Sequence, residues 1–521
     1  MKHLKELVHI VNRNKVKRIE LLDLKADDGS KIQRFYQMIS GEEVHSDAEA
    51  FALLFPGANS RSAYHNLKQR LQERLLNTLF FIDAYQQGHT DRQTAYYELQ
   101  KEFAATQLLL AKNGRSVAIE MLEKVFRRAA RFELTELSVS AARQLRLHYG
   151  TRSFDRERYR FYADRCKHYQ HLARLENKAE EYYTELILAF KNGSTSNDQL
   201  RERSKMLMAE LGEEQGAALS YKFNFYQALI RLFYHTCIND YSSAIPVCDE
   251  TITYFENKPY TASTPIQICL HHKLVAYLQE GNFQQGEQAA RQSQQLLESG
   301  SFNWFKNLEY LLLLAMHTAE HQQAYEVFSE AVNHKRFAYL PEQVREIWQL
   351  YQAYIHLLVD QGEVLPKDND SNFTSFRINR FLNNVPLFSK DKRGMNIAIL
   401  SLQILFYIQK RKYGEVIDRM EAITKYCSRY LFKEGTMRSY YFIKLLLCLP
   451  KANFHREAAL RYAKPILKKL QAIDVNDTKQ FHKIEIIPYE RLWEMTLNML
   501  DAKLVALSRY RRADDSRSTH A

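Results

Sequence analysis

Glycine and proline are scarce in this chain of 521 residues, which contains 16 glycines and 10 prolines. Together they make up about 5% of the residues, whereas average usage is about 12%. Tight turns between strands and phosphate-binding loops both depend on these two residue types. The shortage therefore argues against a β-sandwich, a β-barrel or a glycine-loop nucleotide-binding fold, and it favours a helical protein.

The cysteines give no indication of a metal site or a disulfide framework, and the apolar runs give no indication of a membrane span. None of the six cysteines belongs to a CxxC pair, and their spacings suit neither a zinc site nor a dense disulfide framework. We expect them to be small buried residues in a reducing compartment. The N-terminal segment has no apolar signal-peptide core, and the apolar runs are much shorter than a membrane span. The sequence therefore predicts a cytoplasmic protein without a membrane-spanning segment.

Sequence motifs that carry chemistry are also missing. The chain contains no GxxxxGK[ST], GxGxxG, HExxH or GxSxG pattern. The adjacent pair His271 and His272 would point about 100° apart on a helix, which does not suit a shared metal. Residues 368–379 are similar to the start of a calcium loop, but Phe373 and Asn379 replace the required glycine and glutamate. We therefore predict no catalytic, metal-binding or cofactor-binding residues and no enzymatic activity.

Amphipathic helical segments, by contrast, follow one another from about residue 90 to about residue 508. Short polar breaks such as 112–114 and 280–282 separate them. We assign residues 85–508 to this helical array. Residues 509–521 form a polar tail that should fray.

Residues 1–84 are predicted to form a separate, mostly helical N-terminal unit. Ser46 and Glu49 have capping-box spacing, which predicts a helix over about 47–55. A longer helix should start after Asn59 or Ser60 and reach about residue 83. Its predicted apolar stripe consists of Tyr64, Leu67, Leu71 and Leu75.

This N-terminal unit has two possible roles. Two short helices followed by a long basic one resemble the order of a helix-turn-helix unit, in which Arg61, His65 and Lys68 would contact nucleic acid. The alternative is an end cap that shields the apolar terminal face of the helical array. The sequence leaves both interpretations open.

A weak repeat runs through the helical array. After a short turn, a helix begins with an aromatic or polar residue, and a small residue follows three positions later. The small residues Ala244, Gly286 and Ala324 are 42 and 38 residues apart. Similar starts occur at Arg115, Tyr413 and Phe454. A recurrence near 40 residues with two helices per unit indicates stacked helix pairs, and we expect the three small residues to be buried where paired helices meet.

Residues 280–289, Glu-Gly-Asn-Phe-Gln-Gln-Gly-Glu-Gln-Ala, resemble the turn and second helix of a tetratricopeptide unit, and residues 412–416 are similar. The resemblance covers about residues 100–500. These units are longer than the usual 34 residues, and the Trp-x-x-Leu-Gly part is absent. The resemblance implies an all-α, right-handed superhelical α-solenoid of antiparallel helix hairpins that binds other proteins.

Positive charge is concentrated in one region of the array. The whole chain has a net charge of +12, and residues 115–174 alone contain 14 Lys or Arg and 7 Asp or Glu. Six arginines in successive helices are predicted to form one partner-binding patch: Arg127, Arg131, Arg143, Arg146, Arg156 and Arg160. The competing interpretation is that nearby carboxylates neutralise them, namely Glu120, Glu123, Glu133 and Asp155.

These features predict a non-catalytic scaffold or adaptor that binds another protein through the solenoid surface, with an acidic segment as the expected ligand of the arginines. The alternative is a nucleic-acid-associated regulator that uses the N-terminal basic helix or the basic surface of residues 115–174.

Overall fold

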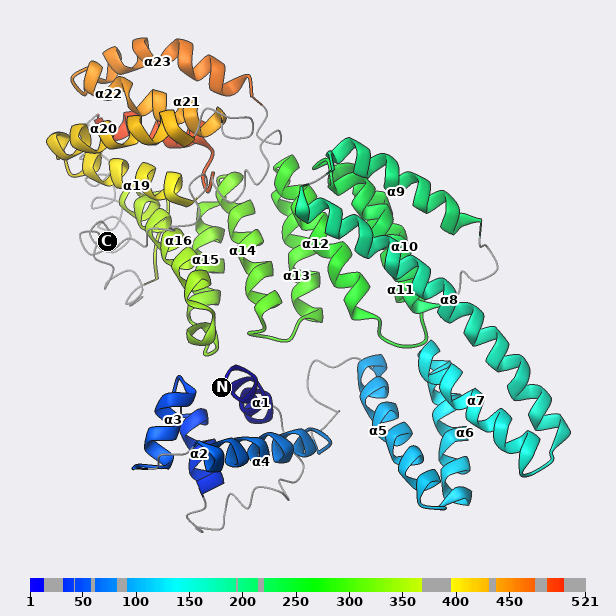
Figure 1. Ribbon diagram of the computed structural model, residues 1–521. Helices are drawn as coiled ribbons and strands as arrows, with labels where there is room; N and C mark the ends of the chain where they lie inside the picture. The colour runs from blue at the N-terminus through cyan, green and yellow to red at the C-terminus, as the bar shows by residue number, and fades with distance from the viewer. Residues whose placement is uncertain are drawn as a thin grey trace, which may run out of the picture. The chain divides into compact units, whose positions relative to one another are not determined.

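The computed structural model describes residues 1–13, 31–41, 43–57, 61–81, 91–193, 195–213, 220–367, 395–430, 437–473 and 485–500. Within these ranges the chain is helical and contains no β-strand, which confirms the predicted all-α class (Figure 1). The same ranges contain no helix that is both long and apolar enough to cross a membrane. The predicted boundary at residues 84 and 85, the residues of the calcium-like loop and the tail at 509–521 lie outside the described residues.

The chain divides into two compact units. The first consists of Met1–Glu181, Glu214–Tyr226 and Lys258–Ala262, and the second of Tyr182–Glu213, Gln227–Asn257 and Ser263–Ala521. The helices numbered up to α8 are α1 (Lys2–Arg13), α2 (Lys31–Ser40), α3 (Asp47–Leu54), α4 (Ser62–Leu79), α5 (Asp91–Ala111), α6 (Arg115–Arg131), α7 (Thr135–Thr151) and α8 (Arg156–Asn192).

The remaining helices belong wholly or mainly to the second unit. Those before residue 300 are α9 (Asn197–Gly212), α10 (Tyr221–Thr236), α11 (Ile245–Glu256), α12 (Ser263–Glu280) and α13 (Phe283–Leu296). Those after residue 300 are α14 (Phe302–His317), α15 (His321–Val332), α16 (Glu342–Asp360), α19 (Met395–Gln409), α20 (Tyr413–Tyr430), α21 (Met437–Leu446), α22 (Cys448–Lys451), α23 (Arg456–Gln471) and α25 (Tyr489–Leu500). The short 3-10 helices Ser242–Ala244 and Phe337–Tyr339 precede α11 and α16.

Helices α1 to α4 share a small apolar core. The predicted stripe of α4 faces it: Tyr64, Leu71 and Leu75 are buried, and Leu67 is partly buried. The Ser46 side chain caps α3 by accepting a hydrogen bond from the backbone N–H of Glu49 at 3.2 Å, as its spacing predicts. Helix α4 ends at Leu79, about one turn before the predicted end, and its predicted caps at 59 and 60 lie outside the described residues.

Many consecutive helices pack against each other in the rest of the described chain. In the first unit α5 contacts α6, α6 contacts α7, and α5 also contacts α7. In the second unit α12 to α16 lie side by side, and α12 also contacts α14 (Figure 1). Large side chains such as Phe305, Trp348 and Tyr351 fill the interior of this second group.

Several of these helices end in the same turn. A residue with positive φ ends the helix, and the N–H of the next residue donates to the carbonyl five positions before it, which is the Schellman arrangement. The positive-φ residues include Asn113 (63°), Gly281 (67°), Ala319 (61°) and Arg411 (56°). The next helix starts two residues later in each case. Arg115, Phe283, His321 and Tyr413 are therefore first residues of helices, which confirms these four predicted helix starts. The start predicted at Phe454 is wrong, because Phe454 adopts φ 58° in the turn and α23 begins at Arg456. The start predicted three residues before Ala244 is also wrong, because a short 3-10 helix ends at Ala244 and α11 begins at Ile245.

The small residues of the repeat lie where helices approach closely. Ala244 and Ala324 are fully buried. A Cβ atom added to Gly286 of α13 would clash with the Leu314 side chain of α14 and would lie 3.2 Å from Tyr277 Cβ of α12. The prediction that these three residues are buried between helices is confirmed.

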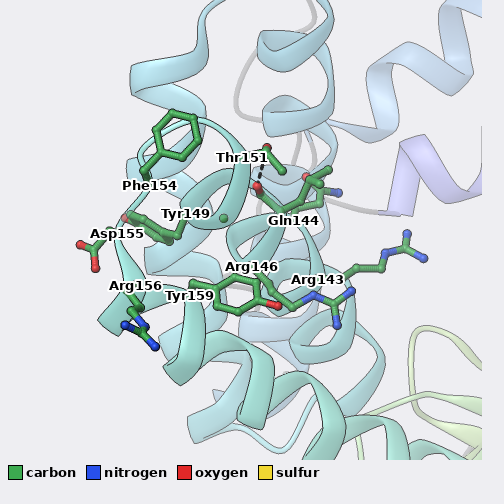
Figure 2. Close-up of a pocket in the computed structure, with 11 residues that line it drawn as sticks. Arg143, Gln144, Arg146, Tyr149, Thr151, Phe154, Asp155, Arg156 and Tyr159 are labelled. Carbon is green, nitrogen blue, oxygen red and sulfur yellow. Dashed lines mark hydrogen bonds between the residues drawn. The ribbon is translucent and has the colours of Figure 1, made fainter.

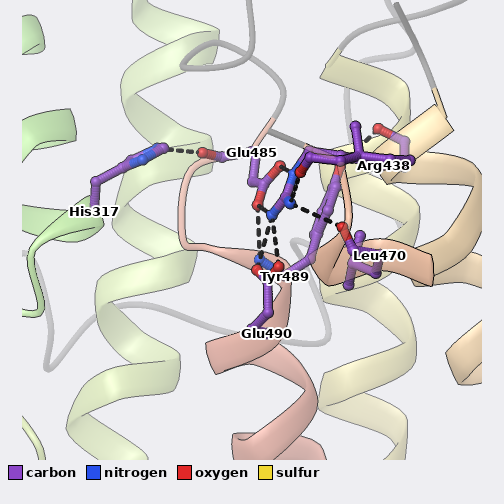
Figure 3. A network of polar contacts seen from close by, with 8 residues as sticks. His317, Arg438, Leu470, Glu485, Tyr489 and Glu490 are labelled. Atoms are coloured by element: carbon purple, nitrogen blue, oxygen red, sulfur yellow. Dashed lines mark hydrogen bonds and ion pairs between the residues drawn. The ribbon is translucent and has the colours of Figure 1, made fainter. Parts of the chain in front are cut away.

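A buried ionic network holds the C-terminal helices together (Figure 3). Arg438 of α21 is 2% exposed, and its guanidinium lies 2.7 Å from Glu485 and 2.8 Å from Glu490. The same side chain donates to the carbonyl of Ile473 at 2.9 Å. His317 Nε2 of α14 donates to the backbone carbonyl of Glu485. The network therefore links α14, α21 and the start of α25.

Candidate functional site

One cavity in the first unit collects half of the predicted arginines. It lies along the C-terminal half of α7, the following turn and the start of α8, and has a volume of about 890 Å³ (Figure 2). We call it the arginine groove. Its lining residues are Arg143, Gln144, Arg146, Leu147, Tyr149, Gly150, Thr151, Phe154, Asp155, Arg156 and Tyr159.

The pattern of α7 explains why two arginines face this groove. Leu137, Ala141, Leu145 and Tyr149 recur at helical spacing and are buried. Arg143 lies on the opposite side of the helix from these positions and is exposed. Arg146 is partly buried and lines the same cavity.

The turn between α7 and α8 brings the third arginine to the groove. Phe154 adopts φ 55°, two residues before α8 begins, as in the other interhelical turns. Asp155 Oδ1 then accepts hydrogen bonds from the backbone N–H groups of Glu157 (3.1 Å) and Arg158 (3.0 Å), which fixes the start of α8. Arg156 follows directly. The Tyr159 ring packs over Gly150, where a Cβ atom would lie only 2.9 Å from the ring.

The charge of the groove comes from three arginines that have no ion-pair partner in the part of the chain that the structure describes. Among the described residues, Arg143, Arg146 and Arg156 form neither an ion pair nor a hydrogen bond. The acidic residue that lines the groove, Asp155, pairs with Arg158 at 3.6 Å, and Glu123 pairs with the same arginine at 3.1 Å. The groove is therefore positively charged.

Hydrogen bonds and a ring contact hold Tyr149, which lines the groove, in position. Tyr149 donates its hydroxyl proton to Glu123 at 2.6 Å, and Arg158 donates to the same hydroxyl at 2.6 Å. Its ring stacks on Tyr162, with centroids 5.7 Å apart. Burial and the bond to Glu123 raise the pKa of Tyr149, so the phenol stays neutral.

Apolar side chains are exposed beside these cations. Phe154 is 79% exposed, Leu147 64% and Tyr159 42%. In Figure 2 the Tyr159 ring lies between Arg156 on one side and Arg143 and Arg146 on the other. Exposed large apolar residues that gather around a charged cavity mark a surface for contact with another molecule.

Of the other predicted arginines, Arg127 and Arg131 lie on α6 and Arg160 lies on α8. Arg127, Arg131 and Arg160 are exposed, but they do not line the groove. The Arg131 guanidinium lies over the Phe132 ring, 5.6 Å from its centroid. The structure thus brings three of the six arginines together, and a continuous patch of all six stays a prediction.

Three of the four carboxylates expected to neutralise the six arginines bind other cations. Glu133 pairs with Lys258 at 2.7 Å, and Glu123 and Asp155 both pair with Arg158. On α6 the internally paired arginine is Arg128, which binds Glu98 and Glu102 of α5. Neither Arg128 nor Arg158 belongs to the six predicted residues.

The predicted nucleic-acid contacts of α4 differ in their surroundings. Arg61 and His65 are exposed, whereas Lys68 lies 2.7 Å from Asp47. Burial acts to raise the pKa of Asp47, but hydrogen bonds from Lys68, Tyr64 and the N-terminal amine outweigh it and hold that pKa well below its usual range. Lys68 is therefore engaged within the N-terminal helices.

A second basic cavity was not predicted. It lies between α21, α22 and α23 in the second unit and has a volume of about 620 Å³. We call it the lysine pocket; its lining residues are Tyr440, Tyr441, Lys444, Leu447, Cys448, Lys451, Pro465, Ile466 and Lys469. A sequence signal exists, since α23 contains five Lys or Arg and one Glu. The residues that α21 and α22 add to the pocket could not be predicted in this way, because they reach it only through the packing of the helices.

The cysteines behave as predicted where they are described. Cys166, Cys237, Cys248, Cys269 and Cys448 are free and buried, and the side chain of Cys427 lies outside the described residues.

Comparison with protein-family models, with curated proteins and with solved structures gives no match for this chain. The case for a function therefore rests on the geometry of these surfaces.

Proposed function

We propose that this protein is a non-catalytic scaffold or adaptor whose arginine groove binds an acidic segment of another protein. The observation that carries the proposal is the set of three arginines without an internal partner, Arg143, Arg146 and Arg156, around one cavity. A guanidinium matches the two oxygens of a carboxylate and forms paired charge-assisted hydrogen bonds with it.

The exposed apolar side chains beside the arginines refine the expected ligand. Phe154 and Leu147 would lose water-exposed surface when an apolar side chain packs on them, which adds affinity that depends little on salt. The arginines would contribute an electrostatic part of the affinity, which weakens as salt screens the charges. A segment with several acidic residues and one large apolar residue would bind both the arginines and the exposed apolar side chains of the groove.

We also propose that the helices of residues 85–508 form a tetratricopeptide-like, right-handed α-solenoid. Three observations support it: the recurring turn, the buried small residues at 244, 286 and 324, and contacts between alternate helices such as α5 with α7 and α12 with α14. Stacked hairpins place every second helix in the same layer, which produces contacts of this kind.

Selection from a displayed library of random peptides on the full chain tests the proposed ligand. The selected peptides should be rich in Asp and Glu and carry a large apolar residue. They should not bind the variant Arg143→Glu/Arg146→Glu. Because Arg143 is exposed and Arg146 has no internal partner, the variant should keep its melting temperature. Selected peptides without acidic enrichment would contradict the proposal.

The nucleic-acid alternative rests on the exposed Arg61 and His65 of α4. A labelled single-stranded oligonucleotide and a duplex, titrated against the full chain, distinguish it from peptide binding. Binding that is lost in Arg61→Glu but kept in Arg143→Glu/Arg146→Glu would favour the regulator over the adaptor.

A further inference from the structure

The lysine pocket is a second charged site, built from three helices. Lys444 and Lys451 come from α21 and α22, and Lys469 comes from α23. Four of the lining residues from α21 and α22 follow helical spacing, so their side chains share one face: Tyr440, Lys444, Cys448 and Lys451. All nine lining residues belong to the second unit.

The lining of this pocket carries positive charge and no negative charge. None of its lining residues is acidic. Within the described part of the chain, Lys444, Lys451 and Lys469 form no ion pair, and all three are exposed. The Lys444 ammonium instead lies over the Tyr440 ring, 5.4 Å from its centroid. Other lysines of the same unit do have partners, such as Lys273 with Asp249 at 2.7 Å.

The rest of the pocket is aromatic and apolar. The Tyr440 and Tyr441 rings meet edge to face with centroids 5.4 Å apart. Leu447, Pro465 and Ile466 also line the pocket, and the thiol of Cys448 is buried. Burial raises the pKa of that thiol, so it stays protonated and adds no negative charge. A volume of about 620 Å³ lies within the usual range for small-molecule sites.

We propose that the lysine pocket binds a nucleoside diphosphate. The diphosphate carries about three negative charges at neutral pH, and these match three ammonium groups that form no ion pair with the described residues. The planar base would lie against the tyrosine rings and the neighbouring apolar side chains. This site is separate from the arginine groove, so the assignment does not depend on the proposed adaptor function.

We infer a phosphate ligand and not a carboxylate because the cations that line the pocket are lysines and not arginines. Paired recognition of carboxylates favours the planar fork of arginine, and the lining of this pocket contains no arginine. Lysine binds phosphate oxygens as a compact point charge. The pocket has no glycine-rich loop, so the lysine side chains would hold the diphosphate.

Isothermal titration of the full chain with ADP, inorganic pyrophosphate and adenosine tests this proposal. We expect ADP to bind, pyrophosphate to bind more weakly and adenosine to show no binding. The variant Lys444→Gln/Lys469→Gln should weaken ADP binding at least about tenfold. Its melting temperature should stay close to that of the parent, because both side chains are exposed.

Lys464→Gln is the matched control. Lys464 lies on the same helix and is exposed, but it lines a different cavity that includes Trp493. It should leave ADP affinity unchanged. The proposal is overturned if ADP does not bind, if the double variant binds ADP as the parent does, or if adenosine or pyrophosphate binds as tightly as ADP. Binding of a single-stranded oligonucleotide without binding of ADP would also overturn it and would assign the surface to nucleic acid.

Discussion

At the scale of single residues, two adjacent arginines on one helix can differ in whether they are paired with carboxylates or exposed to solvent. Arg127 and Arg128 are neighbours in α6, yet Arg128 binds two carboxylates of α5 and Arg127 is exposed without an ion pair in the described structure. Their side chains point about 100° apart. The sequence shows the excess of charge but not which face meets the neighbouring helix, so the predicted arginines include both groove residues and others.

Ala324 should tolerate no larger side chain. It is fully buried on α15, so Ala324→Leu would overpack the contact and lower the free energy of unfolding by roughly 1–3 kcal/mol. Urea unfolding followed by tryptophan fluorescence measures this in the right part of the protein, because Trp304, Trp348 and Trp493 all lie in the second unit.

Ala209→Leu is the control for this substitution. Ala209 is exposed on α9 of the same unit, so the change should alter stability by less than about 0.5 kcal/mol. Equal unfolding curves for Ala324→Leu and the parent would show that the repeat is misplaced.

The buried histidines should make stability depend on pH. Burial, and then the charge of Arg438, lower the pKa of His317 to about 4. In the unfolded chain a histidine has a pKa of about 6.5. Below that pH the unfolded state binds a proton that the folded state does not, so the stabilisation is complete above about pH 6.5 and is lost as the pH falls towards 4.

We therefore expect His317→Gln to flatten the fall in stability between pH 6.5 and 4.5 by up to about 1.4 kcal/mol per pH unit. Urea unfolding of parent and variant at several pH values measures the two slopes. Parallel curves would contradict the burial of a neutral imidazole at this position.

At the scale of helices, local signals in the sequence were reliable because the turns are local structures. Each Schellman turn joins residues within one short segment, so a polar or small residue before an amphipathic run reveals it. The lysine pocket was not predicted for the opposite reason. Lys444 and Lys469 are distant in the sequence and meet only because α21 packs on α23.

The ionic network of Arg438 should be essential for the C-terminal helices. Arg438→Ala would leave Glu485, which is also buried, without its counter-charge and should cost about 3–5 kcal/mol. Arg491→Ala is the matched control, since Arg491 is 39% exposed in its pairs with Glu363 and Glu494. It should cost no more than about 1 kcal/mol. Similar losses in both variants, measured by tryptophan fluorescence in urea, would contradict a special role for the buried network.

At the scale of the whole molecule, the helical class followed from composition and periodicity, because these constrain every segment of the chain at once. The binding surface did not follow in the same way. Arg143 and Arg156 share the arginine groove because the turn at Phe154 reverses the chain between them. Arg127 has the same sequence signal, but it lies outside the groove.

The most direct test of the adaptor proposal compares two pairs of arginines that carry the same charge. A labelled acidic peptide from the library selection is titrated by fluorescence anisotropy at about 0.15 M salt against the parent, Arg143→Glu/Arg146→Glu and Arg127→Glu/Arg131→Glu. The first pair lines the groove and the second does not. The groove variant should bind at least about tenfold more weakly, whereas the second variant should stay within about threefold of the parent because screening limits distant charges. Equal losses in both variants, or no loss in either, would contradict binding in the arginine groove.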